Sequence, residues 1–145
     1  QNMWTLIMLD TYTGRNWQVQ FSVKGKNYMF AAPINIFPLA YPEKSSNWTN
    51  RFQMFATQNM WTFILLDSYD GRLWQVQYST QDLDKLFCIP INKYELVENN
   101  KRCIFSIQPL TSMYQYYLIN DNTGDMWKFQ WSTKGDDYRW IERFR

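Results

Sequence analysis

Apolar and polar positions along this chain of 145 residues follow the two patterns that β-strands produce. Residues 61–67 (WTFILLD) are almost continuously apolar and end at a turn signal, which predicts a short strand buried on both faces. The segment after that turn alternates with a period of two, which predicts a strand with one apolar face. Its apolar face would hold Trp74, Val76 and Tyr78, and its polar face Gln75, Gln77 and Ser79. We therefore expect an all-β protein with almost no helix.

The same pattern occurs three times. Residues 1–22 and 58–79 are identical at 16 of 22 positions, at an offset of 57, and residues 112–132 form a more diverged copy. A related segment follows each copy, and another precedes the second and third, so each repeat should contain four short strands. The sequence predicts a single domain, 1–145, built from three repeats of about 1–50, 51–101 and 102–145.

A polar turn ending in glycine separates the two central strands of every repeat: DTYTG, DSYDG and NDNTG. The leading Asp or Asn can accept backbone N–H bonds, and glycine can adopt the positive φ that closes the turn. Paired carboxylates can also perform acid–base catalysis. Because Asn120 takes the same place in the third repeat, we assign Asp10 and Asp67 to turn structure rather than to catalysis.

Three four-stranded antiparallel repeats with pseudo-threefold symmetry fit two architectures. We favour a β-propeller-like arrangement, because central strands of about seven residues are long for the capping hairpins of the alternative, a β-trefoil. Eleven strands are visible, since the first repeat lacks the leading strand that residues 51–57 give the second. Either residues before Gln1 supply that strand, or another segment closes the ring. The connection from Asn35 to Asn50 should be an exposed loop.

Composition removes several classes of function. The chain has no His, so the commonest general base, the Ser–His and Cys–His pairs and most zinc sites are excluded. A net charge of +2 does not favour a nucleic-acid partner, and no apolar run reaches the roughly 18 residues of a membrane span. The segment DNTGD at Asp121 lacks the glycine of a calcium loop. We expect no enzyme activity, no metal and no cofactor.

Two resemblances support the repeat architecture. The segment LLDSYDGRLW resembles the Leu-Asp-x-x-Thr-Gly…Trp blade of quinoprotein-type propellers, with Asp67, Gly71 and Trp74 in matching places. It implies a propeller fold, and we do not extend it to quinone binding. Most of the chain also resembles small three-repeat β proteins of Bacteroidetes and their phages. The matching positions are Arg51, Phe52, Thr57 to Thr62, Asp67, Gly71 and Trp74 to Gln77. This second resemblance implies a fold and a source but no activity.

Aromatic side chains recur at two places in each repeat. One tryptophan opens each alternating strand and should pack between sheets; these residues are Trp17, Trp74 and Trp127. A second aromatic follows a polar turn, near an end of its sheet, where it either packs in the core or stacks on a sugar or a base. The residues at this second place are Trp4, Trp61 and Tyr114.

Glutamine recurs at Gln20, Gln77 and Gln130, opposite the aromatic face of the strand. These amides either bond to a neighbouring strand's backbone or form a threefold polar ring that reads a ligand. With the three aromatics Trp4, Trp61 and Tyr114, they suggest a non-catalytic binding module for a small polar ligand, with carbohydrate favoured.

Another function class remains open: a protein–protein interaction or structural accessory protein of a cell surface or a phage, with the 35–50 loop as its contact. We expect a monomer. The compartment is open, and an extracytoplasmic or secreted one is favoured. Cys88 and Cys103 are either paired or free.

Overall fold

The computed structural model describes residues 4–41, 49–97 and 103–145, which form eleven strands and three 3-10 turns of three residues each. The first repeat contains β1 (Thr5–Leu9), β2 (Asn16–Gln20), η1 (Lys26–Tyr28) and β3 (Phe30–Asn35). The second contains β4 (Phe52–Ala56), β5 (Thr62–Asp67), β6 (Leu73–Gln77), η2 (Leu83–Lys85) and β7 (Phe87–Pro90). The third contains β8 (Phe105–Pro109), β9 (Gln115–Asn120), β10 (Met126–Gln130), η3 (Asp136–Tyr138) and β11 (Trp140–Arg143). The all-β prediction, with almost no helix, is confirmed for these residues.

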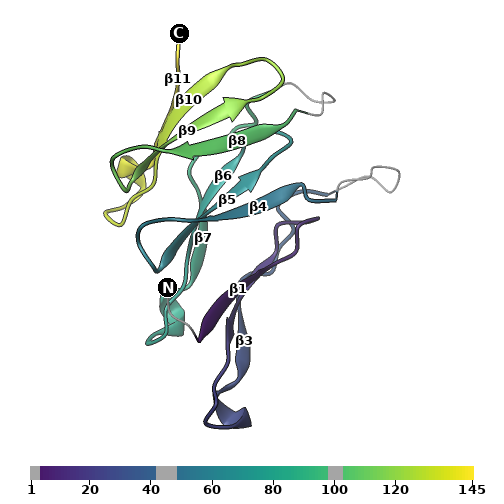
Figure 1. The fold of residues 1–145 in the computed structure, drawn as a ribbon, viewed down its shortest axis with the longest axis vertical. Helices are drawn as coiled ribbons and strands as arrows, with labels where there is room; N and C mark the ends of the chain where they lie inside the picture. Colours follow the sequence, from purple (N-terminus) through teal and green to yellow (C-terminus); the bar gives the residue numbers. More distant parts are fainter. Residues whose placement is uncertain (1–3, 42–48, 98–102) are drawn as a thin grey trace.

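Each repeat folds into its own antiparallel sheet, in which strands consecutive in the chain lie side by side. We name the sheets after their repeats: sheet 1 is β1-β2-β3, sheet 2 is β4-β5-β6-β7, and sheet 3 is β8-β9-β10-β11. Figure 1 shows them following one another along the long axis of the molecule, with sheets 1 and 3 at opposite ends. No sheet formed by the described strands is closed. The structure therefore supports three antiparallel sheets in series, and it does not confirm a propeller or a trefoil.

The predicted turns between the central strands are confirmed. The Asp67 carboxylate accepts a hydrogen bond from the backbone N–H of Tyr69 at 3.0 Å, and Asp10 and Asn120 cap their turns in the same way. Gly71 closes its turn with φ of 78°, a left-handed conformation that a side chain would strain. The turn chemistry read from the sequence thus fixes the hairpin of every repeat.

Pairing registers divide each sheet into two faces. We call A the face that carries the tryptophan opening the second central strand, and B the opposite face. In sheet 2, face A holds Phe63, Leu65, Trp74 and Val76, and face B holds Ile64, Leu66, Leu73 and Gln75. Directly opposite residues share a face because side chains alternate along each strand.

Two hydrophobic cores lie between successive sheets. The first joins face B of sheet 1 to face A of sheet 2 and contains Leu9, Ile34, Leu65, Trp74 and Val76. The second joins face B of sheet 2 to face A of sheet 3 and contains Ile64, Leu66, Leu73, Tyr116, Leu118, Trp127 and Phe129. Sheet 2 is therefore covered on both faces, and β5 is buried on both faces as predicted.

The core prediction for the three strand-opening tryptophans needs one correction. Trp74 and Trp127 are buried, whereas Trp17 is only half-buried. The reason is its position on face A of sheet 1, the face directed away from sheet 2.

The predicted exposed loop from Asn35 to Asn50 is exposed only in part. Phe37 and Tyr41 are well exposed, and residues 42–48 lie outside the described residues. Leu39 and Ala40, by contrast, pack into the first core, where the Leu39 N–H donates to the Thr13 carbonyl. This connection therefore helps to cover the first junction between sheets.

Candidate functional site

A pocket of about 320 Å³ opens between sheets 2 and 3, at the edge formed by β4 and β8. Most of its walls are apolar. They come from the ends of the two edge strands, the connections that follow them, and β9: Phe55, Ala56, Ile107, Pro109, Leu110, Met113 and Tyr116. Three polar residues complete the lining: Thr57, Gln58 and Ser112. A few polar groups in a mostly apolar concavity are typical of small-molecule sites.

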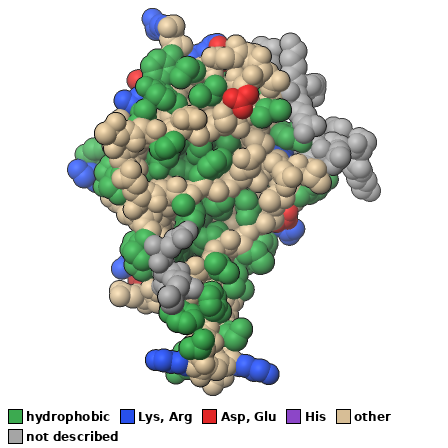
Figure 2. Space-filling view, in the orientation of Figure 1, with side chains coloured by type: hydrophobic (Ala, Val, Ile, Leu, Met, Phe, Trp, Pro, Cys, Tyr) green, Lys and Arg blue, Asp and Glu red, His purple; other side chains and the backbone are tan. Residues whose placement is uncertain are grey.

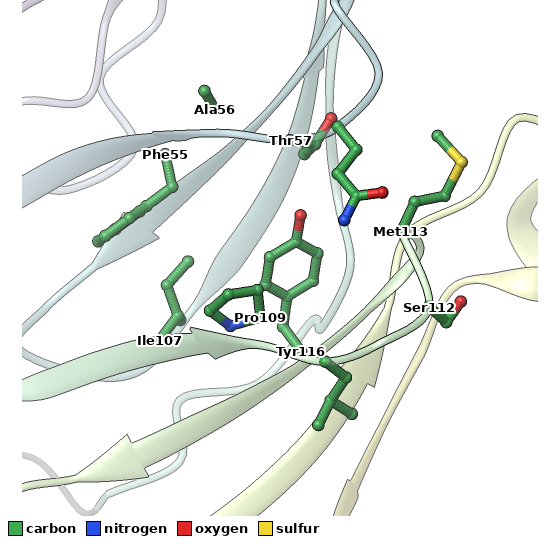
Figure 3. Close-up of a pocket in the computed structure, with 10 residues that line it drawn as sticks. Phe55, Ala56, Thr57, Ile107, Pro109, Ser112, Met113 and Tyr116 are labelled. Carbon is green, nitrogen blue, oxygen red and sulfur yellow. The ribbon is translucent and has the colours of Figure 1, made fainter.

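Tyr116 supplies the central polar group of this pocket. Its ring is buried and stacks on Phe129 with ring centroids 5.4 Å apart, so its position is fixed by the second core. Figure 3 shows its hydroxyl directed into the space between Phe55 and Met113. Burial raises the pKa of the Tyr116 hydroxyl, against the opposing effect of a hydrogen bond with the Trp131 side chain. A tyrosine hydroxyl can both donate and accept hydrogen bonds.

The predicted glutamine ring is not assembled. Gln20 accepts a hydrogen bond from the Thr5 hydroxyl at 2.7 Å, and Gln130 bonds to Gln115 and to the Tyr138 carbonyl. These partners belong to the same repeat as the glutamine, so each of these two amides is bonded within its own repeat and not to the amide of another sheet. Gln77 is half-buried at the same register position of sheet 2. The structure thus brings none of the three predicted glutamines into the pocket.

The three predicted ligand-stacking aromatics each pack on an aromatic neighbour in their own hairpin. The ring pairs are Trp4 with Phe21, Trp61 with Tyr78, and Tyr114 with Trp131, at centroid distances of 5.5, 5.3 and 4.8 Å. Trp4 and Tyr114 remain 37% exposed. None of the three lines the pocket, although Tyr114 is adjacent in sequence to Met113, which does.

A different pair of glutamines, Gln18 and Gln75, is fully buried between the sheets. The Gln18 side-chain oxygen accepts from the Ser79 N–H at 3.3 Å, and that of Gln75 accepts from the Ser132 N–H at 3.1 Å. Each bond links one sheet to the next. Sequence reasoning missed this role, although both residues recur at the repeat offset beside the glutamines it chose.

Charged side chains concentrate at the turn of sheet 2. The Arg51 guanidinium contacts both Asp67 carboxylate oxygens, with its closest approach 2.6 Å, and reaches Asp70 at 3.2 Å. Arg72 adds contacts to both carboxylates. Asp67 is fully buried, so its charge is held by these arginines, which fixes the turn. The structural assignment of Asp67 fits this geometry.

Asp70, in the turn of sheet 2, and Asp10, in the turn of sheet 1, have pKa values shifted in opposite directions. Burial, then the neighbouring charge of Asp67, raises the pKa of Asp70 to about 6 against the opposing effect of the arginines. At Asp10 burial would also raise the pKa, but hydrogen bonds from Thr13, Tyr12 and Arg15 outweigh it and lower the pKa. The first turn is more open to solvent, so its hydrogen bonds decide the direction.

Cys88 and Cys103 are both free, and they belong to different cores. Burial raises the pKa of the Cys88 thiol to about 12, with an opposing hydrogen bond to Asn16, so this thiol is unreactive at neutral pH. In the described ranges, no three Cys, Asp or Glu side chains gather as a possible metal site. No helix within those ranges is long and apolar enough to cross a membrane.

No family model, no curated protein and no solved structure matches this chain. The assignment of a function therefore rests on the chain's own residues.

Proposed function

We propose that this protein is a non-catalytic binding module whose ligand occupies the pocket between sheets 2 and 3. The observation that carries the proposal is the pocket itself: about 320 Å³ of space with apolar walls and the fixed Tyr116 hydroxyl at its centre. This volume lies at the small end of the range for ligand sites.

The lining supports a ligand with an apolar ring face and a few polar groups at its rim. Phe55 and Ile107 face the pocket from β4 and β8, while the Ser112 hydroxyl lies at the rim where β8 has ended. The Thr57 hydroxyl is bonded within its own turn, to the carbonyls of Asn59 and Thr62. A single carbohydrate unit meets this description, because the C–H face of a sugar packs on apolar walls and its hydroxyls bond to polar ones. Carbohydrate is therefore the ligand class that we propose, with Gln58 and Tyr116 as its polar contacts.

The proposal is tested by isothermal titration of the protein with methyl and phenyl glycosides of the common hexoses. The variant Tyr116→Phe removes the hydroxyl and keeps the ring, and it should weaken binding about three- to tenfold, the usual worth of one neutral hydrogen bond. Met113→Trp should weaken binding, because the larger side chain would narrow the pocket.

The matched control is Tyr114→Phe, which removes a hydroxyl next to the pocket but outside its lining. We expect this control to bind as the original protein does. Lack of binding to every glycoside at millimolar concentration would overturn the carbohydrate assignment. Equal losses in Tyr114→Phe and Tyr116→Phe would overturn the assignment of the pocket.

The three sheets in series also support a propeller-like arrangement as part of the proposal. Each sheet is an antiparallel meander, and successive meanders pack face to face through the two cores, as blades do. Small-angle scattering of the protein in solution should fit the open series of blade-like sheets in Figure 1, and a closed ring would contradict this arrangement.

A second candidate function is protein–protein interaction. The observation that favours it is the apolar face A of sheet 1, on which Leu6 and Met8 are exposed. Association with a protein partner that is lost in Met8→Lys, while glycoside binding is unchanged, would favour this function over the first.

A further inference from the structure

Face A of sheet 1 is a continuous apolar surface over three strands. Pairing places Leu6 opposite Val19 and Met8 opposite Trp17, and it continues to Ala31 and Pro33 on β3. None of these side chains is charged, yet Leu6 is 58% and Met8 48% exposed. Figure 2 shows hydrophobic side chains at the surface over β1 and β3, and Lys or Arg side chains at the tip below them.

The equivalent surfaces of the other two repeats are buried. Met8 corresponds to Leu65 and Leu118, and Val19 corresponds to Val76 and Phe129, at offsets of 57 and then 53 residues. All four counterparts have no exposed surface. Face A of sheet 1 thus has the composition of a surface that this fold buries.

The surface that covers face A has the same features at both junctions. It is face B of the preceding sheet, which carries apolar side chains around a buried central glutamine. That glutamine, Gln18 or Gln75, accepts the backbone N–H of Ser79 or Ser132 in the sheet it covers. Ser22 occupies the corresponding position in sheet 1.

The remaining face B, that of sheet 3, lacks these features. Lys128 stands where Gln75 stands in sheet 2, and Glu142 stands where Ile89 stands. Its own aromatic groups partly cover it: the Lys128 ammonium lies 6.0 Å from the centre of the Trp140 ring, and Phe144 packs on Tyr117. Face B of sheet 3 therefore differs from the two faces that cover a neighbouring sheet.

We propose that face A of sheet 1 is a docking surface for one further sheet of the same repeat type. The docking sheet presents an apolar face B with glutamine at the position of Gln18 and Gln75, and this glutamine accepts the Ser22 N–H. A second copy of this chain offers only a face B that would bury the charges of Lys128 and Glu142, which is costly. The inference stands apart from the pocket, which lies at the opposite junction.

The test gives sheet 3 a face B of the kind that covers a neighbouring sheet. The variant Lys128→Gln with Glu142→Ile reproduces the corresponding residues of sheet 2 on sheet 3, so that one molecule can dock on face A of the next. Multi-angle light scattering should show a mass that rises with concentration to at least twice 17.7 kDa, while the original protein stays near that value. Adding Met8→Lys to the double variant should restore the lower mass.

Amide hydrogen exchange at Ser22 distinguishes the proposed docking from nonspecific association, which would not protect this N–H. In the associated double variant the Ser22 N–H should exchange more slowly, while in the variant with Met8→Lys it should not. Tryptophan fluorescence verifies that each variant is folded. If the double variant does not fold, Lys128→Gln alone tests the same docking with a single substitution on face B. An unchanged mass for every folded variant with an altered face B would overturn the proposal. Association of the original protein through Met8 would also overturn it, in favour of a second copy.

Discussion

Residues 1–22 of the first repeat and 58–79 of the second are identical at 16 of 22 positions, but among the described residues sheet 2 packs between two others and sheet 1 packs against a neighbouring sheet on one face only. Trp74 in β6 is buried, whereas its counterpart Trp17 in β2 is only half-buried. At the turns, the ion-pair partner of Asp67 is the buried Arg51, while that of Asp10 is the partly exposed Arg15. Burial is therefore set by the neighbouring sheet, and the same substitution should have different effects in the two repeats.

The largest difference is expected at the two arginine–aspartate contacts. Arg51→Ala leaves the buried charge of Asp67 without its main partner, which should cost about 3–5 kcal/mol of unfolding free energy. Arg15→Ala removes an exposed ion pair and should cost about 1 kcal/mol or less. Urea denaturation of both variants measures the two costs. Equal costs would show that the turn of sheet 2 is not sealed.

The next difference concerns the matched positions on face A. Leu65→Ala creates a cavity in the first core and should cost about 2–5 kcal/mol, whereas Met8→Ala removes a side chain already half in water and should cost less than about 1 kcal/mol. Both values come from the same denaturation experiment. A cost at Met8 as large as that at Leu65 would mean that face A of sheet 1 is covered in solution.

Much of this fold could be predicted from the sequence, because local chemistry determines it. The repeat offset, the period-two alternation and the turn glycines are local signals, and they gave the strands and hairpins correctly. The candidate site, by contrast, could not be predicted from these local signals. The pocket lining from β4 and β8, and the bonds of Gln18 and Gln75 to the next sheet, depend on how the sheets meet, which no single repeat encodes.

The stability contributed by the turns of sheets 1 and 2 should depend on pH in opposite directions. The pKa of Asp70 is raised to about 6, so the stability that its protonated form contributes is present below about pH 4 and is lost as the pH rises through 6. Asp70→Asn keeps the acceptor for the Arg72 N–H and should remove this loss. The change should be at most about 3 kcal/mol, from the size of the shift.

Asp10 should behave in the opposite way. Because its pKa is lowered, it contributes stability that is present above about pH 4 and is lost as the pH falls through its folded-state pKa. Unfolding free energies measured between pH 3 and 7 for Asp70→Asn and Asp10→Asn test both signs. A parallel dependence in the two variants would contradict the proposed difference between the turns.

The smallest difference should appear at the turn glycines, where backbone strain is constant and only the covering sheet changes. Gly71 and Gly124 have φ of 78° and 77°, so alanine should cost about 1 kcal/mol at either position. A β-carbon at Gly71 would also approach the Phe105 ring to 3.0 Å, while none of the described atoms lies within 4 Å at Gly124. Gly71→Ala should therefore cost about 1–3 kcal/mol more, as an overpacked site does. Thermal unfolding of the pair measures this difference, and equal losses would place sheet 3 further from the turn of sheet 2 than the structure does.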